Sequence, residues 1–385
     1  MTSFPFPQSL PDRHRLPARA PGGMSACTAP ARSTASACAA LAVLLAAAPL
    51  ALADHPTVGV AGVGAGPINT ANATTLPKGL FALTLGAEYV NADRYSDAEL
   101  ESFGAQDIEA HSTDKEIVPY VGAAYGVTDD FMVGARLPWL LVDDIREPAP
   151  GGGVDDEGDV NGLGDATLFT QYRFVNDVPS QFEMAVIAGM KVPTGSDREH
   201  SDAGELFETE HQPGSGSWDP LLGLVATQRF GRSTVSAQLM YTKADNGNQD
   251  TNLGDVIGYN LGWSYHVGGP DPLAVKEGAA PHVHQHADGT THVHDDGAPV
   301  AHHEEDMGYD LVLELNGIRR EELTVSGDRD ENTGGNRLYL SPGVRVPMSE
   351  RSSFFASVGL PLFEHLNGSE HETDYRTVLG WSFAY

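Results

Sequence analysis

Apolar and polar residues alternate through most of the chain after residue 78, in segments that polar links separate. In segment 79–91, for example, Phe81, Leu83 and Leu85 alternate with small or polar residues. Successive side chains of a β-strand point to opposite faces, so this period of two predicts strands with one apolar and one polar face. Segments of about ten residues with this pattern are typical of transmembrane β-barrels, whose outer face meets lipid.

Twelve segments alternate in this way, and bacterial single-chain barrels have an even number of strands. A soluble β-sandwich can carry the same pattern, but aromatic residues near the ends of the apolar faces favour a membrane barrel. The sequence therefore predicts an all-β fold, an antiparallel transmembrane β-barrel of about twelve strands over residues 79–385. The segments are 79–91, 117–125, 131–141, 165–175, 182–192, 220–230, 234–241, 256–267, 309–316, 337–346, 354–362 and 374–385.

The beginning of the chain has the pattern of a secretory leader. An apolar run at 39–53 ends in an A-x-A cleavage site at Ala53. We expect a signal peptide over 1–53, with Met24 as an alternative start, and a mature protein in the cell outer membrane. Residues 54–78 precede the first strand and are expected to form either a periplasmic extension or a plug in the lumen.

Composition excludes several classes of protein. The net charge of -30 disfavours a nucleic-acid partner, which attracts basic proteins. The two cysteines, Cys27 and Cys38, both lie in the predicted leader, so we expect no disulfide or thiolate metal site in the mature chain. No G-x-S-x-G or other serine-hydrolase signature occurs. We therefore expect no enzymatic activity and no required cofactor.

The links between the predicted strands alternate between short and long. The short ones are 126–130, 176–181, 231–233 and 348–353, and the long ones are 92–116, 142–164, 193–219 and 319–336. Outer-membrane barrels have short periplasmic turns and long external loops. The first strand is therefore expected to rise from the periplasm, where both ends of the barrel domain also lie.

Charged side chains occur on the polar faces of the predicted strands, where they would line the lumen. Opposite charges inside a barrel form an ion ladder between strands or a lining that selects solutes, and the sequence leaves both readings open. The predicted lumen-lining residues are Glu88, Arg136, Asp165, Arg173, Glu183, Lys191, Glu314, Arg345 and Arg376.

The last predicted strand keeps its alternation up to the final residue, with aromatic and apolar side chains on one face. An aromatic residue at the end of such a strand resembles the signal that the barrel-assembly machinery reads. We expect this C-terminal assembly signal to comprise Tyr375, Leu379, Trp381, Phe383 and Tyr385.

Several short motifs resemble one known family when they are taken in order. They include GPINTANATTLPKGLFALTLGAEY at 66–89, NGLGDATLFTQYRF at 161–174 and AGMKVPTGSD at 188–197. Together they are similar to the outer-membrane transporters associated with the meta-pathway of phenol degradation, over nearly all of the predicted mature chain. The resemblance implies a barrel that passes small solutes, aromatic or hydrophobic ones among them.

Residues 278–306 interrupt the strand pattern with a histidine-rich insert. Two H-x-H pairs in an extended chain place imidazoles on one side, and imidazole with carboxylate suits Zn²⁺, Ni²⁺ or Cu²⁺. We expect weak metal binding here, against the alternative of a polar insert without ligand, and strand counting places the link on the periplasmic side. The predicted ligands are His282, His284, His286, His292, His294, His302 and His303.

Three functions remain open from the sequence. The first is an outer-membrane channel or transporter for small solutes, with membrane lipid and the barrel-assembly machinery as its partners. The second is an envelope metal-binding barrel that acts through the insert. The third is a structural barrel with a closed lumen.

Overall fold

The protein is described by a computed structural model that covers residues 66–269, 282–285, 291–294, 307–349 and 351–385. The predicted leader, residues 54–65 and most of the histidine-rich insert lie outside these residues. Among the helices in the described part of the chain, none is both long and apolar enough to cross a membrane.

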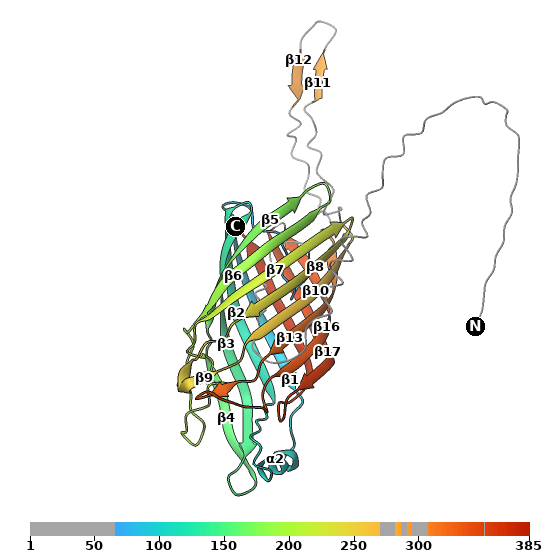
Figure 1. The fold of residues 1–385 in the computed structure, drawn as a ribbon. Coiled ribbons are helices and arrows are strands. Elements are labelled where there is room, and N and C mark those ends of the chain that lie inside the picture. Colours follow the sequence, from blue (N-terminus) through green and yellow to red (C-terminus); the bar gives the residue numbers. More distant parts are fainter. Residues whose placement is uncertain (1–65, 270–281, 286–290, 295–306, 350) are drawn as a thin grey trace, which may run out of the picture. The chain divides into compact units, whose positions relative to one another are not determined.

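Antiparallel strands form a closed β-barrel (Figure 1), which confirms the predicted fold class. The sheet runs β2-β1-β18-β17-β16-β13-β10-β8-β7-β6-β5-β3, and β2 pairs with β3 to close it. The twelve barrel strands are β1 (Phe81–Ala92), β2 (Lys115–Thr128), β3 (Phe131–Pro148), β5 (Ala166–Asp177), β6 (Phe182–Val192), β7 (Asp219–Phe230), β8 (Ser233–Thr242), β10 (Val256–Val267), β13 (Tyr309–Arg320), β16 (Gly335–Ser349), β17 (Ser352–Leu366) and β18 (Thr373–Ala384).

The first and last strands meet along their whole length. In the β1–β18 pairing, Leu83 lies opposite Phe383 and Leu85 lies opposite Trp381. Phe81 and Tyr385 exchange backbone hydrogen bonds of 3.1 and 2.8 Å. The C-terminal residues thus complete the barrel, and of the predicted assembly signal Tyr375, Leu379, Trp381 and Tyr385 are exposed on its outer face while Phe383 is half-buried.

The outer face of the barrel is apolar, as the alternation predicts. Leu222 and Leu360, for example, expose 58% and 47% of their surface. Aromatic side chains lie nearer the strand ends, where Phe81 and Tyr385 pack with ring centroids 6.4 Å apart. So large an exposed apolar surface suits lipid rather than water, because soluble monomers rarely expose extended apolar patches.

The long links carry structure that strand periodicity did not predict. The predicted link 142–164 is largely a hairpin, because β3 continues to Pro148 and pairs there with β4 (Val154–Leu163). The link between β1 and β2 contains the helix α2 (Asp97–Gly104), whose start carries a capping box in which Glu99 accepts a hydrogen bond from the backbone of Ser96. The remaining pieces are η1 (Asn248–Asp250), β9 (Thr251–Asn252), β14 (Thr324–Val325) and β15 (Asp328–Arg329).

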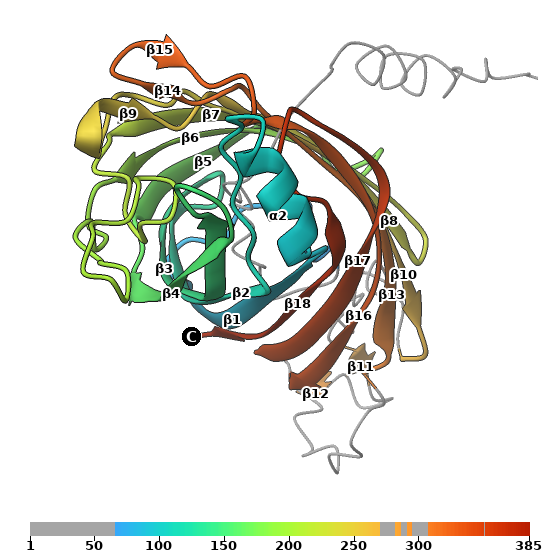
Figure 2. The same ribbon diagram turned by 90° about the horizontal axis from the view of Figure 1, so that it is seen from below.

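The two ends of the barrel differ. One end has the short turns β2–β3, β5–β6, β7–β8 and β16–β17, together with the starting point of β1. The other end has the long links, and α2 lies across the barrel opening in the view from that end (Figure 2). Since β10 ends at Val267 and β13 begins at Tyr309, the histidine-rich link leaves from the end with the short turns.

Inside the barrel, the chain that precedes β1 packs against the inner faces of the strands. Ala71, Ala73 and Leu76 belong to one cluster of buried residues with Phe169 and Ile187 of β5 and β6. A second cluster joins Ile68 to the inward-facing Val312, Phe355 and Val378. Residues 66–76 therefore form a plug segment that occupies part of the lumen.

Candidate functional site: a plugged lumen and a cavity at the end with the long links

The plug segment has no strand partner, and barrel side chains satisfy its backbone instead. The carboxylate of Glu314 accepts hydrogen bonds from the backbone N–H groups of Asn69 and Thr70, at 3.0 and 2.7 Å. The side-chain amide of Asn69 donates to the same carboxylate at 2.8 Å. Such bonds to a charged acceptor are stronger than neutral ones, so Glu314 fixes the middle of the segment.

Other lumen side chains bind the segment on either side of Glu314. Gln171 Nε2 donates to the carbonyl oxygens of Asn72 and Ala73, at 3.0 and 3.2 Å. The guanidinium of Arg345 donates to the carbonyl of Pro67 at 2.9 Å. Because buried backbone groups need partners, these polar residues make an extended chain stable inside the barrel.

A charged network lies beside the end of the segment that leads into β1. Arg173 contacts Glu183 at 2.5 Å and Asp130 at 2.8 Å, and Arg229 reaches Glu183 at 3.0 Å. Glu183 also accepts a hydrogen bond of 2.6 Å from the hydroxyl of Thr74. The network thereby connects the plug segment to β5, β6 and β7.

The nine predicted lumen residues divide into two groups by position. Glu183, Glu314 and Arg345 contact the plug segment, and Arg173 reaches it through Glu183. The others lie apart from the segment's hydrogen bonds. Glu88 pairs with Arg376 at 3.5 Å, and Arg136 stacks over the Tyr120 ring at 4.3 Å. Lys191 pairs with Asp219 at 2.6 Å and lies 4.0 Å from Asp165. The pairing of opposite charges is that of a ladder between strands, and Arg136, Asp165 and Lys191 also line a cavity.

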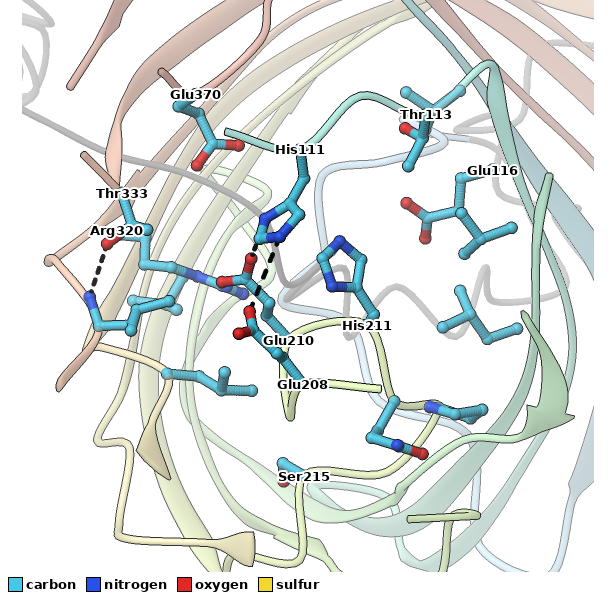
Figure 3. Close-up of a pocket in the computed structure, with 18 of the residues that line it drawn as sticks. His111, Thr113, Glu116, Glu208, Glu210, His211, Ser215, Arg320, Thr333 and Glu370 are labelled. Carbon is cyan, nitrogen blue, oxygen red and sulfur yellow. Dashed lines mark hydrogen bonds and ion pairs between the residues drawn. The ribbon is translucent and has the colours of Figure 1, made fainter. Parts of the chain in front are cut away.

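The cavity has a volume of about 650 Å³ and lies at the end with the long links (Figure 3). Apolar walls come from barrel strands and include Val118, Leu140 and Leu221. Cationic groups reach the same space from Arg136 and Lys191. The arrangement can hold a small molecule that has an apolar body and a polar oxygen.

Two links bring histidines and glutamates together at the cavity wall. His111 lies in the link between β1 and β2, and Glu208, Glu210 and His211 lie in the link between β6 and β7. Figure 3 shows the His111 and His211 rings side by side with Glu208 and Glu210 next to them. The two imidazole centroids are 4.5 Å apart, and Nδ1 of His111 is 3.1 Å from Oε1 of Glu210. We call these four residues the His–Glu cluster.

The cluster shifts the ionisation of its members. Burial would lower the pKa of His111, but hydrogen bonds to Glu147 and Glu210 outweigh burial and raise this pKa well above its usual value. Burial and the neighbouring charge of His111 lower the pKa of His211 to about 4. Burial alone would raise the pKa of Glu210, yet His111 and His211 bring it down to about 2. At neutral pH the cluster therefore contains one charged and one neutral imidazole beside an ionised carboxylate.

The metal ligands predicted from the sequence are other residues than the His–Glu cluster. Four of the seven predicted histidines lie in β11 (His282–Gln285) and β12 (Thr291–His294), a hairpin in which His282 pairs with His294 and His284 with His292. His286, His302 and His303 lie outside the described residues. The His–Glu cluster was missed because its members are in two links without periodicity. The sequence E-x-E-H at 208–211 is the one local signal that points to it.

Comparison with known proteins agrees with the fold. An outer-membrane channel from Pseudomonas putida F1 superposes with a TM-score of 0.53 at 13% identity, covering 82% of this chain and 98% of that one. A mutant of the TodX monoaromatic hydrocarbon channel gives a TM-score of 0.41 at 10% identity, covering 80% of this chain and 91% of that one. The NanC porin gives 0.40 at 7% identity, covering 78% and 98%. No curated protein matches the sequence.

A family model matches the sequence itself. Its description is "Putative MetA-pathway of phenol degradation", and it matches residues 92–301, which is more than half of the 385 residues. The match includes two of the motifs that carry the resemblance, 161–174 and 188–197, whereas the motif at 66–89 lies before it. The chain belongs to this phenol-degradation family.

Proposed function

We propose that this chain is an outer-membrane channel that takes up small solutes, phenolic compounds among them, from the side of the long links. The cavity is the observation that carries the proposal. Its volume of about 650 Å³ lies within the usual range for small-molecule sites. Apolar walls beside the guanidinium of Arg136 suit an aromatic ring that carries a hydroxyl.

Family membership supports the solute class. The family description names phenol degradation, and an enzyme pathway inside the cell needs its substrate to cross the outer membrane first. The barrel fold and the apolar outer face supply a structure that can cross that membrane.

The plug segment constrains how such a channel works. Residues 66–76 occupy the lumen on the side of the cavity away from the long links, so a solute that fills the cavity meets the segment next. We propose that passage requires the segment to shift within the lumen. A permanently fixed segment corresponds instead to the structural barrel with a closed lumen.

Two valine substitutions in one strand test the channel. Val118 of β2 is buried and lines the cavity, whereas Val121 of the same strand exposes 46% of its surface on the outer face. Val118→Trp fills part of the cavity and should reduce uptake of labelled phenol nearly to the rate of cells that lack the protein. Val121→Trp adds the same side chain to the lipid side and should leave uptake unchanged.

The measurement is the initial rate of phenol uptake by cells that produce equal amounts of folded barrel. Equal rates for wild type, Val118→Trp and cells without the protein would contradict the channel and favour the structural barrel. A loss of uptake in Val121→Trp as well would mean that the assay reports barrel assembly rather than the cavity.

A second candidate function is metal binding by the histidine-rich insert, and the register of β11 and β12 favours it. The backbone pairing brings His282 opposite His294 and His284 opposite His292. A peptide of residues 278–306 should then bind Zn²⁺, Ni²⁺ or Cu²⁺ more tightly than the same peptide with these four histidines replaced by serine. Equal affinities by calorimetric titration would remove this candidate.

A further inference from the structure

Two links that are far apart in the sequence bring four metal-binding side chains together beside the cavity. One potential ligand atom from each of His111, Glu208, Glu210 and His211 lies within 4.8 Å of all the others. A tetrahedral zinc ion, with bonds of about 2.1 Å, holds its ligand atoms roughly 3.4 Å apart. Side-chain movements of about 1 Å would therefore complete the coordination shell.

We propose that the His–Glu cluster binds a divalent transition-metal ion, for which zinc is the best match. Imidazole nitrogens combined with carboxylate oxygens are a donor set that zinc takes in proteins. Calcium and magnesium prefer shells made of oxygen alone, so two histidines argue against them. The site is distinct from the histidine-rich insert, which leaves the barrel from the opposite end.

The position of Glu147 beside His111 is a second observation that supports metal binding. Oε2 of Glu147 lies 3.4 Å from Nε2 of His111, and Oε2 of Glu208 lies 3.8 Å from the same nitrogen, whereas Nδ1 of the ring faces Glu210 at 3.1 Å. Histidines that bind a metal through one nitrogen almost always donate the other N–H to a carboxylate or carbonyl. Glu147 of β3 is thus placed to orient the ring, with Nδ1 directed toward the ion.

Negative charge around the cluster favours a cation. Glu109, Glu116 and Glu370 line the cavity together with the cluster. Neighbouring carboxylates repel one another, and a cation between them reduces this repulsion. A bound dication would also join the β1–β2 link to the β6–β7 link at the cavity wall.

Zinc titration of the full-length protein tests the site. The protein is purified from outer membranes, stripped of metal with a chelator and titrated calorimetrically with zinc chloride. The double variant His111→Asn/His211→Asn should bind one equivalent fewer than wild type, whatever number the histidine-rich insert contributes to both. The matched control is His200→Asn/His365→Asn, which changes two exposed histidines at the same end, one in the β6–β7 link and one near the end of β17, and should bind as wild type does.

The same number of zinc equivalents in all three proteins would overturn the proposal. It would identify His111 as an imidazolium ion held by carboxylates alone. The variant Glu147→Gln tests the site without removing any of the proposed ligands. It should weaken zinc binding at the cluster about 10–100-fold, the usual effect of losing such an orienting partner, and unchanged affinity would count against the site.

A variant with a changed metal preference distinguishes the loss of a metal ligand from the loss of loop structure. His211→Cys substitutes a thiolate at the same position and should bind cadmium with thiolate charge-transfer absorption, because soft metals select soft ligands. The wild-type protein has no cysteine among the described residues and should lack this absorption. A His211→Cys barrel that assembles normally and shows no cadmium band would contradict coordination by residue 211.

Discussion

At the scale of single residues, Glu314 shows how a buried carboxylate can hold a segment of chain. Its two oxygens accept hydrogen bonds from the backbone of Asn69 and Thr70 and from the amide of Asn69. Alternation along the strand predicted that this side chain points into the lumen. The partner was not predictable, because residues 66–76 carry no periodicity that would indicate where they lie.

Glu314→Gln should loosen the plug segment without opening the barrel wall. The amide retains one acceptor but loses the charge, and hydrogen bonds to charged groups are worth about 1.5–3 kcal/mol each. We expect the amides of Asn69 and Thr70 to exchange hydrogen roughly 10–100-fold faster, as measured by mass spectrometry. Glu88→Gln is the control, since Glu88 pairs with Arg376 away from the segment. Equal exchange in Glu314→Gln and wild type would show that packing of Ile68 and Leu76 dominates instead.

The His–Glu cluster could not be predicted from the sequence. A strand period specifies which face a side chain takes, so charged positions in the predicted strands could be assigned to the polar face in advance. His111 and His211 lie in links whose paths depend on tertiary contacts, such as the 2.6 Å ion pair between Arg146 and Asp97. The spacing of residues in the sequence does not show that two such links meet in space.

At the scale of elements, all twelve barrel strands could be predicted because each alternates over a length that crosses a membrane. The strand β4 was not predicted, because its residues, VDDEGDVNGL, have no apolar face. The helix α2 was not predicted either, although the Ser96–Glu99 capping box signals its start. Its eight residues have little apolar periodicity and lie within a region that was expected to be a loop.

The closing strand β18 is followed by Tyr385, the last residue of the sequence. Removing Tyr385 deletes the reciprocal backbone bonds with Phe81 and the aromatic contact between the two rings. If the C-terminal residues are the assembly signal, the shortened chain should accumulate less heat-modifiable barrel in outer membranes. Phe230→Ala removes an exposed aromatic side chain at the same end of the barrel and should assemble normally. Equal assembly of the shortened chain and wild type would mean that the signal lies in the other strand residues.

At the scale of the whole molecule, the lumen has two compartments. The cavity occupies the end with the long links, and the plug segment fills the space beyond it with both apolar and polar contacts. The number of strands could be inferred from sequence, but the state of the lumen could not, because a barrel of twelve strands lies between filled eight-stranded barrels and open sixteen-stranded channels.

Deleting residues 66–76 should convert the barrel into an open channel. The strands and their pairing remain, so the barrel should still assemble, with lower stability because inward residues such as Phe169 and Phe355 lose their contacts. Single-channel recordings in planar bilayers should show larger and more frequent conductance steps than wild type. Unchanged conductance in a deletion variant that assembles would place the block outside the plug segment.

The plug segment is covalently joined to β1 through residues 77–80, in which the backbone N–H of Lys78 donates to Asp129 at the barrel rim. A tethered occupant returns to its site at an effective concentration on the order of millimolar, without having to be captured from solution. Each barrel would therefore reseal by itself after a solute has passed. Reclosure would follow first-order kinetics that are independent of how many copies the membrane contains.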